Sequence, residues 1–260
     1  MDTLHFERYE YKYFVPESVT DRVREFVRPY VKPDAHAVGK PGGRYTIHNI
    51  YLDTPGLDFF HAGMDDAPDR FKLRIRWYDP EAQGPFFFEV KRKIRQVIVK
   101  DRVRISRDEL LAIVRDGPLS LPDGATRRSI LAFLDQATCT GAVPTVMCRY
   151  TREPYESAFG EYARVTFDRA VCFQEARDFE LLGNPRDWSY VDAEWATRGI
   201  RCASIIELKF TNEFPRWMSD LVAEFELERM GYSKYNSSII HRAQKALGTL
   251  EGFQSAASGW

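Results

Sequence analysis

Apolar and charged residues alternate with a period of two along several stretches of the chain. In DRFKLRIRWYD (69–79), the odd positions from 71 to 77 are apolar, and Lys72, Arg74 and Arg76 lie between them. Successive side chains of a β-strand point to opposite faces of the sheet. The pattern therefore predicts a strand with one apolar face and one cationic face.

Seven further stretches also read as strands, and most of them place charged residues on one face. They span 6–14, 44–54, 86–94, 97–106, 147–151, 164–168 and 205–210. Strands that are apolar on one side only are typical of antiparallel sheets. We therefore expect an antiparallel sheet.

Apolar residues at helical spacing predict four helices between or after these strands. The helices are expected over 16–31, 107–116, 127–138 and 215–231. The sequence contains no internal repeat, so we expect one domain over residues 1–247. Residues 248–260 are rich in Ser, Ala and Gly and are expected to form a frayed tail.

The charge balance limits what the cationic strand faces can mean. The chain has 37 Lys and Arg against 38 Asp and Glu, a net charge of −1. A general nucleic-acid binder is usually basic overall, so no nucleic-acid partner is expected. A solvated outer face is the simplest explanation of charged strand residues. However, like charges on neighbouring strands repel. A sheet closed into a barrel, with helices outside, would gather the cations around a cavity for a polyanion.

Several common chemical motifs are absent from the sequence. It has no G-x-x-x-x-G-K-[ST], G-x-G-x-x-G or G-x-S-x-G, and no C-x-x-C or H-x-x-x-H pair. Arginines and lysines suit phosphate oxygens, and carboxylates suit Mg²⁺ or Mn²⁺. These residues favour phosphoryl transfer, which relies on positioning and charge neutralisation. No apolar run is long enough to span a bilayer, and the start lacks the apolar core of a signal peptide, so a cytoplasmic protein without a membrane segment is expected.

Eight short motifs follow one another along most of the chain. They are RYEYKYFV (8–15), YLDT (51–54), KLRIRWY (72–78), FEVKRK (88–93), CRYTREPY (148–155), RVTFD (164–168), IIELKF (205–210) and SKYNSS (233–238). Together they resemble the VTC (vacuolar transporter chaperone) polyphosphate-polymerase domain of the CYTH-like triphosphate tunnel metalloenzymes. The resemblance implies an α+β fold. In that fold an eight-stranded antiparallel β-barrel, with helices packed outside, encloses a basic triphosphate tunnel.

The resemblance also implies roles for individual residues of these motifs. The implied catalytic phosphate binders are Lys12, Arg74, Arg76, Lys91, Arg149, Arg164, Lys209 and Lys234. Strand alternation had selected seven of these, whereas Lys234 rests on SKYNSS alone. Further substrate-binding residues are expected at Arg8, Lys72, Lys93, Lys100, Arg102 and Arg104. Mn²⁺ or Mg²⁺ would bind Glu207, assisted by Glu10 and Glu89.

Structural alternatives exist for these residues. Each cation could be an ordinary surface charge. Glu207 could be the ion-pair partner of an inner lysine. Asp168 is expected to order Arg164 or a neighbouring arginine rather than to bind metal.

The expected function is metal-dependent transfer of the γ-phosphate of a nucleoside triphosphate, with ATP as the expected nucleotide, to a polyphosphate chain. The alternatives are a triphosphatase and a non-catalytic polyphosphate- or nucleotide-binding module that regulates a partner. Hydrolytic relatives begin with E-x-E-x-K, whereas this chain has Arg8 at the first position, which favours the polymerase. Eukaryotic polymerases of the family carry an N-terminal regulatory domain and membrane helices. We expect neither here, and a membrane-protein partner could supply the anchor.

Overall fold

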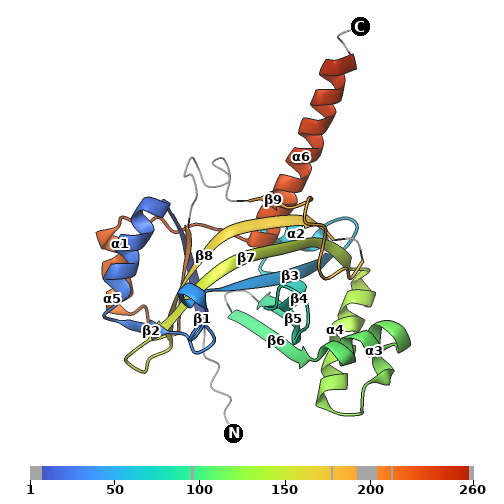
Figure 1. Cartoon of the computed structure of the whole chain (residues 1–260), viewed down its shortest axis with the longest axis horizontal. Helices are drawn as coiled ribbons and strands as arrows, with labels where there is room; N and C mark the ends of the chain where they lie inside the picture. Colours follow the sequence, from blue (N-terminus) through green and yellow to red (C-terminus); the bar gives the residue numbers. More distant parts are fainter. Residues whose placement is uncertain (1–7, 95–96, 177, 192–203, 212, 258–260) are drawn as a thin grey trace.

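The computed structural model describes residues 8–94, 97–176, 178–191, 204–211 and 213–257, except for the side chains of 8, 97 and 248–257. Ten strands form one antiparallel sheet (Figure 1). The strands are β1 (Arg8–Val15), β2 (Val31–Pro33), β3 (Tyr45–Asp53), β4 (Asp69–Trp77), β5 (Phe86–Ile94), β6 (Val97–Ile105), β7 (Val143–Ser157), β8 (Ala163–Glu175), β9 (Ser189–Tyr190) and β10 (Ser204–Thr211). The helices are α1 (Glu17–Val27), α2 (Asp58–Met64), α3 (Arg107–Asp116), α4 (Ala125–Thr140), α5 (Arg216–Glu224) and α6 (Lys234–Ala257), with short 3₁₀ turns at Pro41–Gly43 and Pro118–Ser120.

The sheet is strongly curved but open, so the predicted closed barrel is not observed. Its strands are hydrogen-bonded in the order β1-β10-β8-β7-β3-β4-β5-β6, with β2 beside β7 and β9 beside β8. The curvature brings β5 towards β1, as shown by the distance of 3.1 Å between Lys91 Nζ and Glu10 Oε2. Part of the free edge of β1 is taken by the segment before α6, where the Met230 amide donates to the Lys12 carbonyl. This pairing explains why β6 does not complete the ring.

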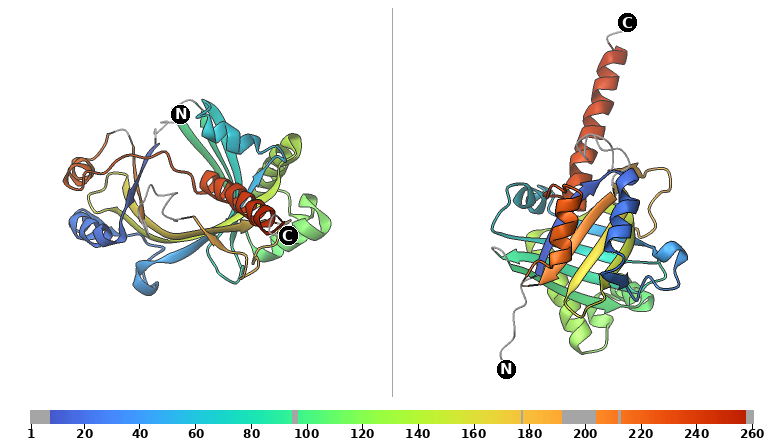
Figure 2. Two further views of the ribbon diagram at one scale, coloured as in Figure 1. Left: turned by 90° about the horizontal axis from the view of Figure 1, so that it is seen from above. Right: turned by 90° about the vertical axis from the view of Figure 1, so that its left-hand side faces the viewer.

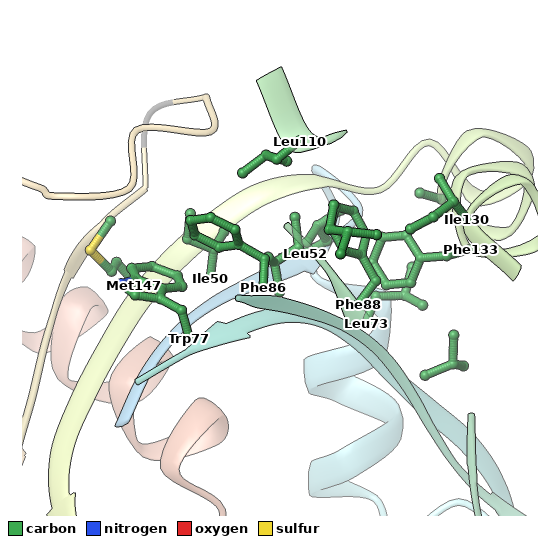
Figure 3. Packing of buried hydrophobic residues seen from close by; sticks show 14 of the residues in the cluster. Ile50, Leu52, Leu73, Trp77, Phe86, Phe88, Leu110, Ile130, Phe133 and Met147 are labelled. Atoms are coloured by element: carbon green, nitrogen blue, oxygen red, sulfur yellow. The ribbon is translucent and has the colours of Figure 1, made fainter. Parts of the chain in front are cut away.

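One outer core lies where α3 and α4 cover the convex side of β3 to β6 (Figure 3). Leu73, Ile75 and Trp77, the apolar residues of the alternating segment, are almost fully buried there. Ser106 caps α3 with a reciprocal Ser–Glu pair to Glu109. Burial of the odd-numbered side chains fixes the register of β4, because a one-residue slip would turn them to the inner face and place the cations against the outer helices.

A second outer core lies where α1 and α5 cover β1, β8 and β10 (Figure 2). Val23 of α1 and Leu221 of α5 pack on Phe167 and Leu208 of the sheet, all fully buried. The expected placement of helices outside the apolar strand faces is therefore confirmed at both ends of the sheet.

The last third of the chain departs from the sequence prediction. The helix expected over 215–231 ends at Glu224, because the backbone turns at Glu226 (φ 48°). The residues expected to be frayed continue α6 to Ala257, and its C-terminal half projects away from the sheet (Figures 1 and 2). Within the described residues, no helix has the length and apolarity needed to cross a bilayer.

Candidate functional site: the inner face of the sheet

The side of the sheet that contacts the first turns of α6 is called the inner face here. Strand register places the sequence-predicted cations of six strands on this one face. They are Lys12, Lys72, Arg74, Arg76, Lys91, Lys93, Lys100, Arg102, Arg104, Arg164 and Lys209, joined by Lys234 from α6. Glu10, Glu89 and Glu207 share the face. The prediction of a common cationic face is confirmed for these residues.

Arg149 is the exception, and its predicted place beside Arg74 and Arg76 is wrong. Arg149 lies opposite His48 of β3 in the strand register, on the outer side of the sheet. Its guanidinium donates to Cys172 Sγ at 3.2 Å and stacks on Trp188. The inner side of β7 is occupied here by Tyr150, which packs against α6. Val146, Cys148 and Tyr150 therefore point inward here, which inverts the alternation seen in β4.

Two other predicted residues differ from the main group. The strand position of Arg8 lies opposite Thr211, but its side chain falls outside the described part of the structure. Arg164 reaches Asp34 at 3.5 Å and Glu156 at 3.7 Å, and its side chain is 42% exposed. Arg164 therefore lies at the rim of the inner face.

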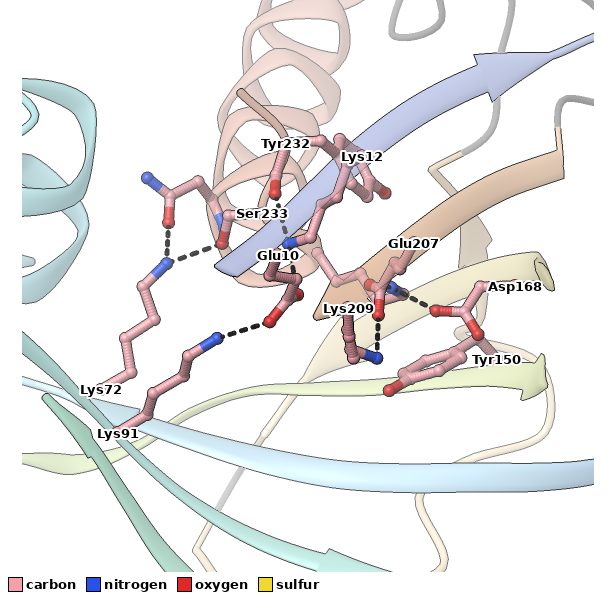
Figure 4. Close-up of polar contacts among 12 residues, drawn as sticks. Glu10, Lys12, Lys72, Lys91, Tyr150, Asp168, Glu207, Lys209, Tyr232 and Ser233 are labelled. Carbon is pink, nitrogen blue, oxygen red and sulfur yellow. Dashed lines mark hydrogen bonds and ion pairs between the residues drawn. The ribbon is translucent and has the colours of Figure 1, made fainter. Parts of the chain in front are cut away.

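A buried cluster of ions surrounds Glu207 (Figure 4). Its carboxylate accepts from Lys234 and Lys209 at 2.8 Å and from Arg152 at 2.9 Å. Asp168 is fully buried and accepts from Arg152 at 2.6 and 2.7 Å. Burial opposes ionisation of Glu207, but Lys209 and the other two cations outweigh it and hold its pKa well below the usual value. The expectation that Asp168 orders an arginine is confirmed, with Arg152 as that arginine.

Glu89 forms a second, separate cluster on β5. Its carboxylate is fully buried and contacts Arg74 and Lys100 at 2.6 Å and Arg102 at 3.2 Å. Burial raises the pKa of Glu89, but the surrounding cations, Arg74 first, lower it further than burial raises it. Glu89 is therefore held ionised as the counter-ion of its neighbours.

Lys72 is a cation of the inner face for which the structure shows only neutral partners. Its ammonium donates to Ser233 Oγ at 2.7 Å and to Asn236 Oδ1 at 2.8 Å. Burial lowers the pKa of Lys72 to about 7, and repulsion from Lys12 and Lys91 adds to the effect. A lysine with a lowered pKa is stabilised strongly in its charged form when an anion binds beside it, because the nearby negative charge raises the pKa again.

The three expected metal ligands do not come together. In the described residues, no three His, Cys, Asp or Glu side chains lie close enough to hold an ion. Glu10 and Glu207 are diagonal neighbours on β1 and β10, whereas Glu89 belongs to the other cluster. Glu10 contacts Lys12 at 3.3 Å and Lys91 at 3.1 Å. Of the three expected ligands, Glu10 and Glu207 are therefore the pair that lies on neighbouring strands.

The sequence reasoning missed four residues that shape this site. Arg152 bridges Asp168 and Glu207, and Ser233 and Asn236 hold Lys72. Gly63 of α2 lets Asn236 approach, because a Cβ there would lie 2.8 Å from its amide nitrogen. Arg152 could have been predicted from the sequence, since it stands three positions after Arg149 in the same motif. The other three depend on packing between α2, α6 and β4, which strand alternation does not show.

Comparisons with known proteins give a family and a fold. The family model described as the VTC domain matches residues 7–241. A crystal structure from Bacillus halodurans, provisionally described as an adenylate cyclase, is 12% identical and has a TM-score of 0.50. The match covers 88% of this chain and 96% of that one. The PH1819 protein of Pyrococcus horikoshii OT3 is 16% identical over 90% of this chain and 99% of that one, with a TM-score of 0.42. No curated protein matches the sequence.

Proposed function

Because the chain belongs to the VTC domain family, we propose that it is a metal-dependent polyphosphate polymerase. It transfers the γ-phosphate of a nucleoside triphosphate, ATP in the first instance, to a polyphosphate chain bound on the inner face. The reaction needs several phosphates to be held at once, and the density of lysine and arginine on this face supports such binding.

The single observation that carries the proposal is the state of Lys72. It lies half-buried among Lys12, Lys91 and Arg74, and its contacts go to a hydroxyl and an amide oxygen. A merely structural cation of this kind would be paired with a carboxylate, as Lys234 is. Lys72, a cation without an acidic partner among the described residues and with other cations around it, supports an anionic ligand as the missing partner.

The proposed step uses the substrates' own groups for its bond changes. A terminal phosphate oxygen of the chain attacks the γ-phosphorus, while the bond from that phosphorus to the β–γ bridging oxygen breaks. The electron pair leaves on the nucleoside diphosphate, and the chain grows by one phosphate. The protein's part is to align the two phosphates and to offset their charge, which is where catalysis of phosphoryl transfer mainly lies.

The carboxylates favour transfer to phosphate over transfer to water. A triphosphatase benefits from a base that activates water, and a useful base has a pKa near the working pH. Cations hold the pKa values of Glu10, Glu89 and Glu207 below their usual values, although burial acts in the opposite direction. Such groups are weak bases. A polyphosphate end is already an anionic nucleophile and needs no such help.

Glu10 and Glu207 are the residues that would hold Mn²⁺ or Mg²⁺. Their oxygens are the donor type that these ions prefer, and Mg²⁺ is commonly bound by one or two carboxylates plus substrate phosphates. When bound, the ion would neutralise charge on the reacting phosphates. Lys91 and Lys209, which contact the two carboxylates here, would then be free to turn towards phosphate oxygens.

The test is to incubate the purified protein with ATP, Mn²⁺ and a short polyphosphate primer and to follow chain length on a gel. Longer chains in the wild type, and at least tenfold slower growth in Lys72→Met, support the proposal. The matched control is Arg149→Ala, which removes a cation from the outer face and should elongate chains normally. Release of free phosphate without elongation would identify a triphosphatase. Binding without either product would identify a binding module.

Glu207→Gln separates the metal role from a purely structural role of that residue. It keeps the size and one oxygen of the side chain but removes the negative charge. If Glu207 binds the metal, this substitution should lower turnover about a hundredfold, because the ion contributes several kcal/mol to catalysis. If the folded variant still responds to Mn²⁺ concentration as the wild type does, Glu207 is an ion-pair residue only.

A further inference from the structure

An aromatic groove lies outside the sheet, away from the inner face. Its cavity of about 1010 Å³ lies between the start of α5, the end of α1 and the turn that joins β7 to β8. The aromatic side chains that line it are Tyr30, Phe159, Tyr162, Phe214 and Trp217. Nothing in the proposed phosphoryl transfer uses this groove.

The groove has a fixed aromatic surface. The rings of Tyr30 and Trp217 are nearly parallel, with centroids 5.6 Å apart and planes at 6°. Phe159 stands on the β7–β8 turn with 66% of its surface exposed. The Ser157 hydroxyl holds this turn, because it donates to Glu161 and accepts from the Phe159 amide. Phe159 therefore adds an exposed phenyl ring to the other aromatic rings that line the groove.

The rim of the groove is acidic. Glu161, Glu213 and Asp220 line it, and all three are exposed. Arg216 is the one cation of the lining among the described residues, and its guanidinium lies 3.9 Å from Asp220. This charge is opposite in sign to that of the inner face. Phosphate ligands are therefore disfavoured here, and a cationic ligand is favoured.

We propose that this groove binds a basic, proline-containing extended segment of a partner protein. Proline-rich segments adopt an extended helix before binding and dock in grooves lined by aromatic rings. The exposed ring of Phe159 and the partly exposed rings of Tyr30 and Phe214 offer faces for proline rings. The acidic rim then selects arginine or lysine next to the prolines, both by charge and by cation–π contact with exposed rings.

The test uses a fluorescein-labelled peptide of twelve residues. Every second residue is proline, and the positions between the prolines are filled alternately by arginine and leucine. One control peptide has glutamate in place of arginine, and the other has alanine in place of proline. Fluorescence anisotropy should show that the basic proline peptide binds at least tenfold more tightly than either control. Its affinity should fall as salt rises, because the rim charges are exposed.

Two variants locate the binding. Phe159→Ala should weaken the peptide at least fivefold and Glu213→Lys at least tenfold, with unchanged circular dichroism. Phe179→Ala is the matched control, since it removes another exposed phenyl ring that does not line the groove. Equal binding of all three peptides, or unchanged affinity in both groove variants, overturns the proposal. So does a dimer in sedimentation that Phe159→Ala dissolves, because the occupant is then a second copy of the chain.

Discussion

Lys234, which is buried, and Lys72, which is half-buried, are two lysines of the inner face whose surroundings are opposite. Lys234 lies between Asp168 and Glu207, at 2.6 and 2.8 Å, and burial lowers its pKa less than these carboxylates raise it, leaving it well above the usual value. Lys72 contacts Ser233 and Asn236, and its pKa is lowered to about 7. The first lysine completes an ion cluster within the protein. The second has no acidic partner among the residues that the structure describes. This difference separates the structural part of the inner face from the proposed binding part.

The largest expected effect is on stability when Lys234 is removed. Lys234→Met leaves Asp168 and Glu207 with fewer counter-charges in a buried site. Breaking a buried ion cluster in this way costs about 3–5 kcal/mol. Urea unfolding at pH 7 measures the loss. Lys245→Met, on the exposed part of the same helix, should change stability by less than about 0.5 kcal/mol. A loss of under about 1 kcal/mol for Lys234→Met would contradict the assigned role.

Lys72→Met should reverse this pattern. The variant removes a buried charge that its neighbours repel, while it loses two hydrogen bonds worth about 1 kcal/mol each. The free energy of unfolding at pH 7 should therefore stay within about 1 kcal/mol of the wild type. Binding of tripolyphosphate, measured by calorimetry, should weaken by about 1.5–3 kcal/mol for the lost charged hydrogen bond. Equal destabilisation by Lys72→Met and Lys234→Met would remove the distinction between the two lysines.

Because Lys72 titrates near neutral pH, both the stability of the protein and its affinity for phosphate should depend on pH. With a folded pKa of about 7 against 10.5, the unfolded chain binds more protons between these values, so the contribution of Lys72 to stability rises with pH there. A bound phosphate raises the pKa of Lys72 again. Binding at pH 8 should therefore take up as much as about one proton, and affinity should fall above pH 7. Calorimetry in buffers of different ionisation enthalpy measures this uptake, which should disappear in Lys72→Met.

The smallest expected effect belongs to Arg149. Because its side chain stacks on Trp188 on the outer side of β7, Arg149→Ala should leave tripolyphosphate affinity within about twofold of the wild type. The same calorimetric titration tests it at low salt, where distant charges act most strongly. A tenfold loss in a variant with unchanged circular dichroism would place Arg149 among the ligand-binding residues after all.

Strand alternation was enough to predict the sheet and its cationic face, because burial of one side of a strand leaves the other side for charge. Lys72, Arg74 and Arg76 were identified in this way, and β4 has the predicted register. The rule failed at Arg149, where a helix packs on the inner face and the apolar residues turn inward. It also could not show that β1 and β6 stay unpaired, because part of the free edge of β1 is taken by the segment before α6, which has no alternating pattern.

The partners of the charges were not predictable from the sequence. Glu207 was expected to bind metal, or to pair with an inner lysine, and the structure shows contacts to Lys209, Lys234 and Arg152 together. The helix that carries Lys234 was itself not predicted, since its first turns are buried on the sheet while its later turns are exposed. Such a helix has no single amphipathic pattern along its length.

α6 is, in mechanical terms, a lever with its short arm inside the protein. Its first residues contact Lys72, Asp168 and Glu207, and its far end projects clear of the sheet (Figure 2). A straight helix of 24 residues is about 36 Å long. Tilting such a rod by about 5° about its buried end moves the far end by about 3 Å. A displacement of the exposed end therefore becomes a movement of less than about 1 Å at the buried residues. Hydrogen-bond lengths vary over a similarly small range, so such a movement can change the contacts among the ions.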